Sequence, residues 1–424
     1  MRKWLIGLGI GALLLCGGVC LVSALLVRPP KIEIPPRQYP PNNAYDIYRQ
    51  LGAEISERSK GNAQISVIAR KLPRGTLTPA ERELYLTFME PYLREYRKHL
   101  NKPCVAVYEY DPNWLFPELT GFRSIARAEA YLMREDLRNR RDRSAVERFT
   151  SLLRFGNQIR NEGTLIHNLV GIALTNIGLS PLWEVSLQSE GALAEMVKTA
   201  QWYDKERVPP LRAVRAERYF GLSILNNLAE GKLSTEDLSN MGASTPASNK
   251  RNPFGVIISR LLVRTALPEY QKYMDTVEQQ FQRPYWQRQK SFPEPRHFLN
   301  ALLVPTYERY SLLETEERAR IRLTGVMSAV RLYKLRNGRY PKNLETLNLG
   351  ELIIDPFSGK PFVYRADPRK GFMLYSVGAN GVDDGGAFPY EGARAEKGDL
   401  VPLYRPVPSH LPSKRTLHPP TWLR

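Results

Sequence analysis

The sequence predicts a mainly α-helical protein that ends in a small α+β module and begins with a transmembrane helix. Three observations lead to this fold class. The segment from residue 4 to 27 carries no charge. In several segments between residues 44 and 336, apolar side chains recur three and four positions apart, as on one face of a helix. After residue 360, short segments rich in aromatic residues alternate in polarity, as strands of a small antiparallel sheet do.

The N-terminal segment 1–28 is predicted to be a retained membrane anchor. Its charge-free part, at about 1.5 Å per residue, is long enough to cross a hydrocarbon layer of roughly 30 Å. A cleaved secretory signal has a shorter apolar region of about 7–15 residues, and cleavage near Ala24 is the alternative. Arg2 and Lys3 favour a cytoplasmic tail. The chain is therefore expected to cross the inner, or cytoplasmic, membrane once, with its bulk on the extracytoplasmic side.

Composition and charge narrow the class of the exported part. A content of 42% hydrophobic and 25% charged residues is typical of a folded protein. Cys104 is the only cysteine outside the anchor, so no intramolecular disulfide is expected there. The net charge of +18 predicts attraction to anionic lipid or cell-wall polymers rather than to nucleic acid. The basic run at residues 134–143 contains interleaved acids and is interpreted as a solvated helix end.

Segment 29–42 is rich in proline and is predicted to be a semi-rigid extended linker that lifts the folded part off the bilayer. A helical domain is expected over residues 43–305. Thr78-Pro79-Ala80-Glu81 has the form of a capping box that starts a helix. Between residues 125 and 197 we expect stacked helical hairpins, which resemble tetratricopeptide-like pairs at the level of fold only.

Breaks in these hairpins are expected at residues 161–163 and at Ser180-Pro181. The apolar stretch from Leu165 to Trp183 is interspersed with polar residues, which indicates a buried core helix rather than a second membrane span. A polar loop is expected over residues 234–253, a further helix over 257–282 and a hinge over 286–305. The proline-rich tail 406–424 is predicted to be disordered.

No catalytic residue is predicted, and the protein is not expected to be an enzyme. The sequence has no His-Glu-x-x-His, no Gly-x-Ser-x-Gly and no phosphate-binding Gly-x-x-x-x-Gly-Lys-Ser/Thr motif. Its histidines are scattered without metal-ligand spacing. Cys104 has no base placed beside it by the sequence, and His167 on an apolar helix is interpreted as a hydrogen-bonded core residue.

Three segments of the C-terminal part occur in an informative order. Residues 333–341 read Tyr-Lys-Leu-Arg-Asn-Gly-Arg-Tyr-Pro, residues 355–364 read Asp-Pro-Phe-Ser-Gly-Lys-Pro-Phe-Val-Tyr, and residues 374–381 read Leu-Tyr-Ser-Val-Gly-Ala-Asn-Gly. This order resembles the periplasmic head of the major pseudopilins of type II secretion, members of the pilin-like superfamily. The resemblance implies a pseudopilin-like module over residues 306–405, in which a long helix packs on a small antiparallel sheet.

The resemblance also implies a calcium-binding loop. Acidic residues among glycines supply the carboxylate, amide and backbone oxygens that calcium prefers. Carried over by position, the best ligand candidates are Asp383, Asp384 and Asp399, and Asn380 and Ser376 are weaker ones. The alternative is that Asn380-Gly381 and Asp384-Gly385 are plain turn dipeptides.

The chain departs from the family because several hundred residues separate its anchor from its head, and no prepilin peptidase site precedes the anchor. Assembly into a pilus is therefore not expected. The predicted function is a membrane-anchored extracytoplasmic scaffold that binds envelope proteins, associated with type II secretion or pilus-like machinery. The alternatives are a cell-envelope hydrolase with its site in the helical domain, and a purely structural envelope protein.

Overall fold

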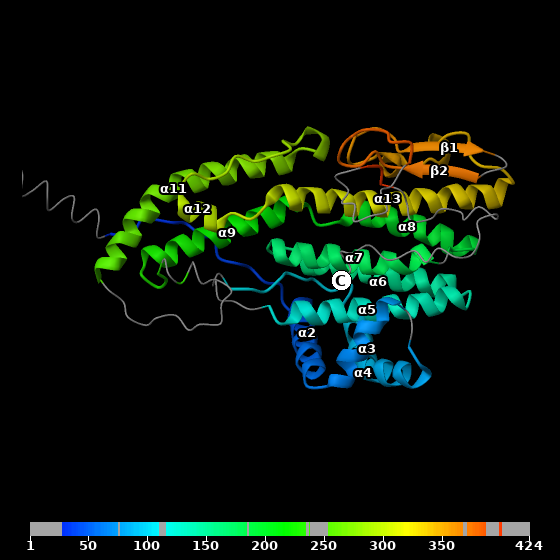
Figure 1. Ribbon diagram of the computed structural model, residues 1–424, viewed down its shortest axis with the longest axis horizontal. Helices are drawn as coiled ribbons and strands as arrows, with labels where there is room; N and C mark the ends of the chain where they lie inside the picture. The colour runs from blue at the N-terminus through cyan, green and yellow to red at the C-terminus, as the bar shows by residue number, and fades with distance from the viewer. Residues whose placement is uncertain are drawn as a thin grey trace, which may run out of the picture.

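The computed structural model describes residues 28–74, 77–109, 116–184, 186–234, 237, 253–367, 371–386 and 398–400. The predicted anchor up to residue 27 and the predicted tail 406–424 lie outside the described residues, as does most of the polar loop. Within these residues the chain is mainly helical and carries a small two-stranded antiparallel sheet, as the sequence predicts (Figure 1).

The helices lie close to the positions that apolar periodicity predicts. The α-helices are α2 (Ala44–Lys60), α3 (Ala63–Lys71), α4 (Pro79–Arg97), α5 (Glu118–Arg138), α6 (Asp142–Arg160), α7 (Leu165–Glu184), α8 (Glu190–Glu206), α9 (Pro210–Ala229), α11 (Pro253–Gln282), α12 (Phe298–Leu303) and α13 (Tyr307–Asn337). Short 3₁₀ turns are η1 (Leu72–Arg74), η2 (Tyr285–Gln287), η3 (Glu345–Leu347) and η4 (Gly350–Ile353).

The start of α4 shows why one boundary was predictable. The Glu81 amide donates to Thr78 Oγ1 at 3.2 Å, and the Thr78 amide donates to Glu81 Oε2 at 2.9 Å. The predicted capping box is thus confirmed, with Pro79 in the first turn. The break predicted at Ser180-Pro181 is wrong, because α7 continues to Glu184 with Pro181 inside it. Pro181 cannot donate to the carbonyl four residues earlier, so the helix passes through it with one backbone hydrogen bond fewer.

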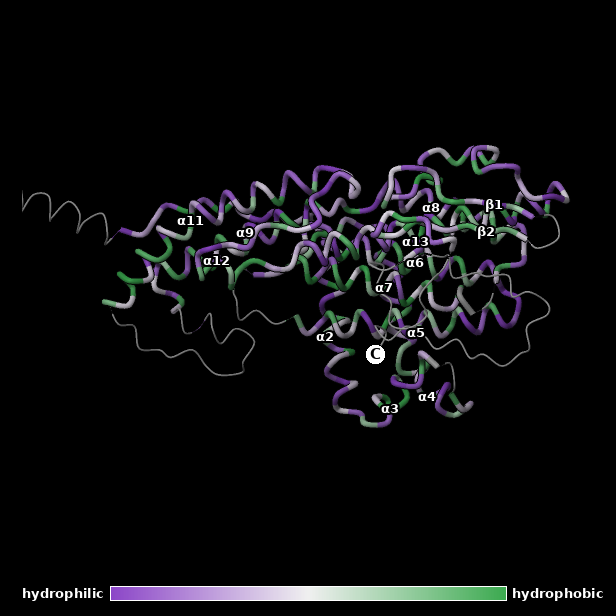
Figure 2. The backbone as a smooth tube through the Cα atoms, turned by 45° about the horizontal axis from the view of Figure 1, so that its top comes forward, coloured by the Kyte–Doolittle hydropathy of each residue, from purple (hydrophilic) through white to green (hydrophobic). Residues whose placement is uncertain are grey.

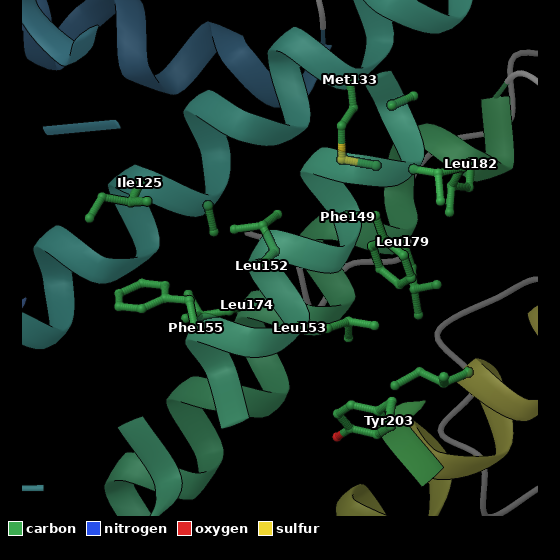
Figure 3. Close-up of a cluster of buried hydrophobic side chains, with 14 of the residues drawn as sticks. Ile125, Met133, Phe149, Leu152, Leu153, Phe155, Leu174, Leu179, Leu182 and Tyr203 are labelled. Carbon is green, nitrogen blue, oxygen red and sulfur yellow. The ribbon is translucent and has the colours of Figure 1, made fainter. Parts of the chain in front are cut away.

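Three helices form the centre of the molecule. α5, α6 and α7 pack against one another, and α8 packs on α6 on one side while α2 crosses α5 on another. Figure 3 shows the interior, where Ile125 and Met133 of α5 meet side chains of the other helices, among them Phe149, Leu152, Leu153 and Phe155 of α6, Leu174, Leu179 and Leu182 of α7, and Tyr203 of α8. The apolar α7 lies mostly inside the protein, as expected of a core helix.

The crossing of α2 and α5 depends on two glycines. A Cβ added at Gly121 would lie 2.1 Å from the Gly52 carbonyl oxygen, and one added at Gly52 would lie 2.5 Å from the Glu118 carbonyl oxygen. No larger residue fits such a close backbone approach.

A long helix joins two cores. The first part of α13, with Tyr307 and Tyr310, belongs to a hydrophobic cluster shared with α9 and α11. Its later part, with Ile321 and Val326, belongs to the main cluster and lies along α8. Figure 1 shows α13 running between the α9–α11 pair at one end and the sheet at the other.

The sheet pairs β1 (Val363–Asp367) with β2 (Gly371–Tyr375), and Tyr364 lies opposite Leu374. Leu374 and the neighbouring loop residues Phe357 and Phe362 are buried in the main cluster beside the end of α13. The helix and strands of the predicted C-terminal module are therefore present, and α13 is packed on the helical part along most of its length. The boundary at residue 305 stays a prediction.

The proline-rich segment 29–42 differs from the free-standing spacer that its composition predicts. It is extended, but Ile32 and Ile34 pack against the second cluster. Arg37 donates to the Ala106 carbonyl at 2.5 Å, and its guanidinium lies 3.7 Å from the centre of the Tyr108 ring. Proline sets the backbone conformation but not what the intervening side chains contact, so the segment lies along the body instead of standing off it.

Candidate metal site in the C-terminal module

The two motifs Asp-Pro-Phe-Ser-Gly-Lys-Pro and Tyr-Ser-Val-Gly meet at one buried carboxylate, Asp355. Its Oδ1 accepts from the Phe357 amide at 2.9 Å and from the Ser376 hydroxyl at 2.9 Å. Its Oδ2 accepts from the Val377 amide at 3.1 Å. Burial raises the pKa of Asp355, and these donors oppose the rise. Asp355 thus ties the loop before β1 to the end of β2.

The loop around Asp355 is closed by its backbone. The Asp355 amide donates to the Lys360 carbonyl at 2.7 Å, and the Gly359 amide donates to the Asp355 carbonyl at 2.8 Å. Gly359 has a φ of +71°, and a Cβ there would lie 2.5 Å from the Trp286 ring. Only glycine combines this backbone conformation with contact to an indole. The Asp-Pro-Phe-Ser-Gly-Lys-Pro motif therefore builds a tight turn before β1.

Asp383 lies just beyond β2 and is held by three partners. The Tyr375 hydroxyl donates to Asp383 Oδ1 at 2.8 Å, and the Gly385 amide donates to the same oxygen at 2.9 Å. Arg365 Nη2 lies 3.6 Å from Asp383 Oδ2. The Tyr375 hydrogen bond is the main reason why the pKa of Asp383 is lowered. Burial, with this carboxylate, raises the pKa of Tyr375 to about 12.

Asn380 and Asp384 face each other in the same loop. Asn380 Nδ2 donates to Asp384 Oδ2 at 2.9 Å, and Asn380 Oδ1 accepts from the Val382 amide at 3.2 Å. Gly381 and Gly385 both have positive φ, as turn dipeptides require. The turn interpretation of this loop is therefore supported by its backbone, and it is compatible with a ligand role for the Asp384 carboxylate.

Asp399 approaches this loop from a later segment. The backbones of Ser376 and Leu400 pair as an antiparallel bridge, with N···O distances of 3.0 and 2.8 Å. This pairing brings Asp399, the residue before Leu400, next to the end of β2. Asp399 is fully buried and its Oδ2 accepts from the Gly386 amide at 2.7 Å. Among the described residues, its Oδ1 has no hydrogen-bond partner. Burial raises the pKa of Asp399. Hydrogen bonds from the Gly386 and Asp384 amides oppose the rise, and the charges of Asp384 and Asp383 add to it.

Asp383 and Asp384 lie near enough to Asp399 for their charges to act on its carboxyl, and Asn380 hydrogen-bonds Asp384. Ser376 serves a different purpose, because its hydroxyl donates to Asp355 and accepts from the Gly378 amide at 3.1 Å. Within the part of the chain that the structure describes, no three His, Cys, Asp or Glu side chains converge as a ready metal cage. Asp399 nevertheless keeps one buried carboxylate oxygen without a hydrogen-bond partner among the described residues, and a bound cation would satisfy it.

The helical part holds a second group of titratable residues, around Cys104 and His167. The Tyr45 hydroxyl donates to Glu118 Oε1 at 3.1 Å, and the rings of Tyr45 and Phe116 lie 5.8 and 5.0 Å from the His167 ring. Burial raises the pKa of Cys104 and of Glu118 and lowers that of His167 to about 3. All three side chains are therefore favoured in their neutral forms, which is the opposite of an activated thiolate.

Comparison of the chain with known protein families, with characterised proteins and with solved structures finds no match. The described residues define a mainly helical protein with a small two-stranded sheet and an acidic loop at its C-terminal end.

Proposed function

We propose that the protein is a single-pass, membrane-anchored scaffold of the cell envelope whose pseudopilin-like head binds calcium. The scaffold binds other envelope proteins, within type II secretion or pilus-like machinery. The observation that carries the calcium site is Asp399, a buried carboxylate with an unpartnered Oδ1 that is crowded by Asp383 and Asp384. The resemblance to pseudopilins implies calcium ligands at these same three positions.

A divalent cation would remove the electrostatic conflict at this site. Three carboxylates near one another repel when all are ionised, and the buried one is further penalised by loss of water. Calcium coordinated by Asp399, Asp384 and Asp383, with the Asn380 amide oxygen as a further donor, would compensate these charges. Ser376 is not included, since its oxygen is committed to Asp355 and Gly378.

The scaffold role rests on the helical array. Stacked antiparallel helices give an extended rigid surface for other proteins, and a C-terminal module fixed to that array is held in a defined position. α13 supplies this fixation, because it contacts α8 and α7 along its length and then carries the sheet at its end. Attraction of a strongly basic protein to anionic lipid or cell-wall polymers would add to its retention at the envelope.

The test is thermal unfolding of the full-length protein in detergent micelles, with calcium or with chelator. A ligand that binds only the folded state raises the midpoint of unfolding. We expect calcium to raise it, magnesium to raise it less, and Asp399→Ala or Asp383→Ala to remove the rise. Glu351→Ala is the matched control, since it removes an exposed carboxylate from the same module outside the acidic loop.

Equal midpoints with calcium and with chelator in the unaltered protein would remove the metal site. A rise that survives Asp399→Ala and Asp383→Ala would place calcium elsewhere. The hydrolase alternative with Cys104 as its nucleophile would require a thiolate. Burial raises the pKa of this thiol and so disfavours the thiolate.

A further inference from the structure

The first turns of α11 carry an apolar face that points to solvent. Phe254, Ile257, Ile258 and Leu261 stand at the i, i+3, i+4 and i+7 positions of one helix face, and Phe254 is 68% and Leu261 50% exposed. The side of the helix that contacts the core is carried instead by Val263, Ala266 and Tyr270, all buried. α11 therefore has one buried and one exposed apolar face.

The short helix α12 continues this exposed face. Its Phe298 and Leu302 are one turn apart, and both are at least half exposed, at 50% and 54%. Asn300 Nδ2 donates to the Ala266 carbonyl of α11 at 2.9 Å, and the Thr265 hydroxyl lies 3.1 Å from His297 Nε2. Thr265 is one turn beyond Leu261 on the same helix face, so the apolar residues of the two helices form one patch. We call Phe254, Ile257, Ile258, Leu261, Phe298 and Leu302 the α11–α12 patch.

The chain places its N-terminal segment at this patch. Arg264 Nη2 donates to the Arg28 carbonyl oxygen at 2.6 Å, and Arg264 lies about one helical turn from Leu261. Ile32 and Ile34 pack on the second cluster, so the chain just after Arg28 is held against the helical part. Figure 1 shows the beginning of the described chain beside the free end of α11, and Figure 2 shows hydrophobic residues at that end.

We propose that the α11–α12 patch lies in the interfacial layer of the membrane that holds residues 4–27. This inference rests on the membrane anchor of the proposed function and adds a second, non-spanning contact to it. Arg28, the residue after the predicted anchor, lies against α11 beside the patch, so the bilayer that would hold the anchor is the apolar phase nearest to it. Arg260 and Arg264 lie on α11 next to the patch and Arg28 is held against Arg264, where anionic headgroups would attract basic side chains. An exposed apolar helix face with basic neighbours is the composition of an interfacial helix.

The consequence is a fixed orientation of the protein on the membrane. The α9–α11 end would rest on the bilayer, and the sheet with the acidic loop, at the other end of α13, would be held away from it (Figure 1). The head would then be presented to partners deeper in the envelope by a rigid body rather than by a flexible tether.

The test measures how close α11 lies to lipid in the full-length protein reconstituted into vesicles of phosphatidylglycerol and phosphatidylethanolamine. Cys16 and Cys20 are replaced by alanine, the buried Cys104 is retained, and a fluorophore is attached to a Leu261→Cys variant. The matched control is Leu335→Cys, because Leu335 is 56% exposed and lies at the opposite end of α13. Ile258→Cys serves as a second label position on α11. The three labelled variants are compared by how strongly a lipid with a nitroxide high on its acyl chain quenches their fluorescence.

We expect the labels of the Leu261→Cys and Ile258→Cys variants to be quenched at least about threefold more strongly than that of Leu335→Cys, as for a helix buried in the interfacial layer. Equal quenching at the three positions in protein that floats with the vesicles would overturn the inference and leave the anchor intact. Weak quenching at α11 with energy transfer between differently labelled copies would assign the patch to a second copy and also overturn it. Protein that does not float with vesicles would remove the anchor and the inference together.

Discussion

The Ser376 hydroxyl donates a hydrogen bond to Asp355 Oδ1 over 2.9 Å, and both side chains are buried. This contact joins the segment before β1 to the end of β2, which are 21 residues apart. It gives the Asp-Pro-Phe-Ser-Gly and Tyr-Ser-Val-Gly segments a structural reason to occur together. It also engages the Ser376 hydroxyl, and the proposed calcium site therefore leaves Ser376 out.

Replacement of Asp355 by alanine should destabilise the protein by about 2–4 kcal/mol, because the Phe357 and Val377 amides and the Ser376 hydroxyl lose their acceptor. Urea unfolding of the full-length protein measures the loss, and Glu351→Ala, at an exposed site in the same module, should change stability by less than about 0.5 kcal/mol. Equal effects of the two variants would mean that Asp355 does not organise the head.

Asp399→Asn should stabilise the metal-free protein at neutral pH. The pKa of Asp399 is raised on folding, so the folded state binds its proton more tightly and stability falls as pH rises above the ordinary carboxyl range. An amide retains an acceptor for the Gly386 amide and carries no charge. In chelator the variant should unfold at a higher temperature than the wild type, and with calcium the order should reverse. A lower midpoint in both conditions would argue against a penalised carboxylate.

His167 should make the protein sensitive to acid. Its pKa is lowered to about 3 by burial and by the nearby Arg37 charge, so below its ordinary value the unfolded state binds a proton that the folded state does not. Stability is therefore lost as pH falls from about 6.5 towards 3, with about 2–3 kcal/mol lost at pH 4.5. His167→Phe should flatten this part of the pH profile relative to the wild type. Parallel profiles for the two proteins would show that the histidine is charged when folded.

The sequence allowed the helices and strands to be predicted because their signals are local. The spacing of apolar residues marks α2, α6 and α11, and the Thr78 capping box marks the start of α4. Pro181 gives a false signal of a helix end, because in a sequence a proline inside the last turns of a helix looks the same as one that ends the helix.

The contacts that assemble the candidate site could not be predicted in the same way. A buried aspartate such as Asp355 and an exposed one such as Asp383 look alike in a sequence, and burial is decided by elements far along the chain. The same holds for Arg160 and Glu317, which are 157 residues apart and form an ion pair in the core. The contacts of segment 29–42 with the second cluster could not be predicted for the same reason.

Gly121→Ala should destabilise the protein by about 1–3 kcal/mol or more, since its Cβ would lie 2.1 Å from the Gly52 carbonyl oxygen and α2 would have to move away from α5. Gly191→Ala in α8 is the matched control, because nothing lies within 4 Å of the added Cβ. It should leave stability unchanged or raise it by about 0.5–1 kcal/mol, through the better helix propensity of alanine. Equal changes in thermal midpoint would show that α2 and α5 do not cross in close contact.

Glu317→Gln tests how α13 is fixed to the helical array. Arg160 of α6 donates to Glu317 of α13 through both terminal nitrogens, with Nη1 2.7 Å from Glu317 Oε2, and also to the Tyr203 hydroxyl at 2.9 Å. Both members of the pair are buried, so removing the carboxylate leaves an uncompensated guanidinium in the core and should cost about 3–5 kcal/mol.

Glu190→Gln is the control. It breaks the exposed pair between α8 and Arg336 of α13, and should cost less than about 1 kcal/mol. Urea unfolding at low and high salt separates the two, because the exposed pair is screened and the buried one is not. A cost for Glu317→Gln as small as that for Glu190→Gln would mean that α13 is held by apolar packing alone, and that the charge pair adds no further restraint on the position of the head.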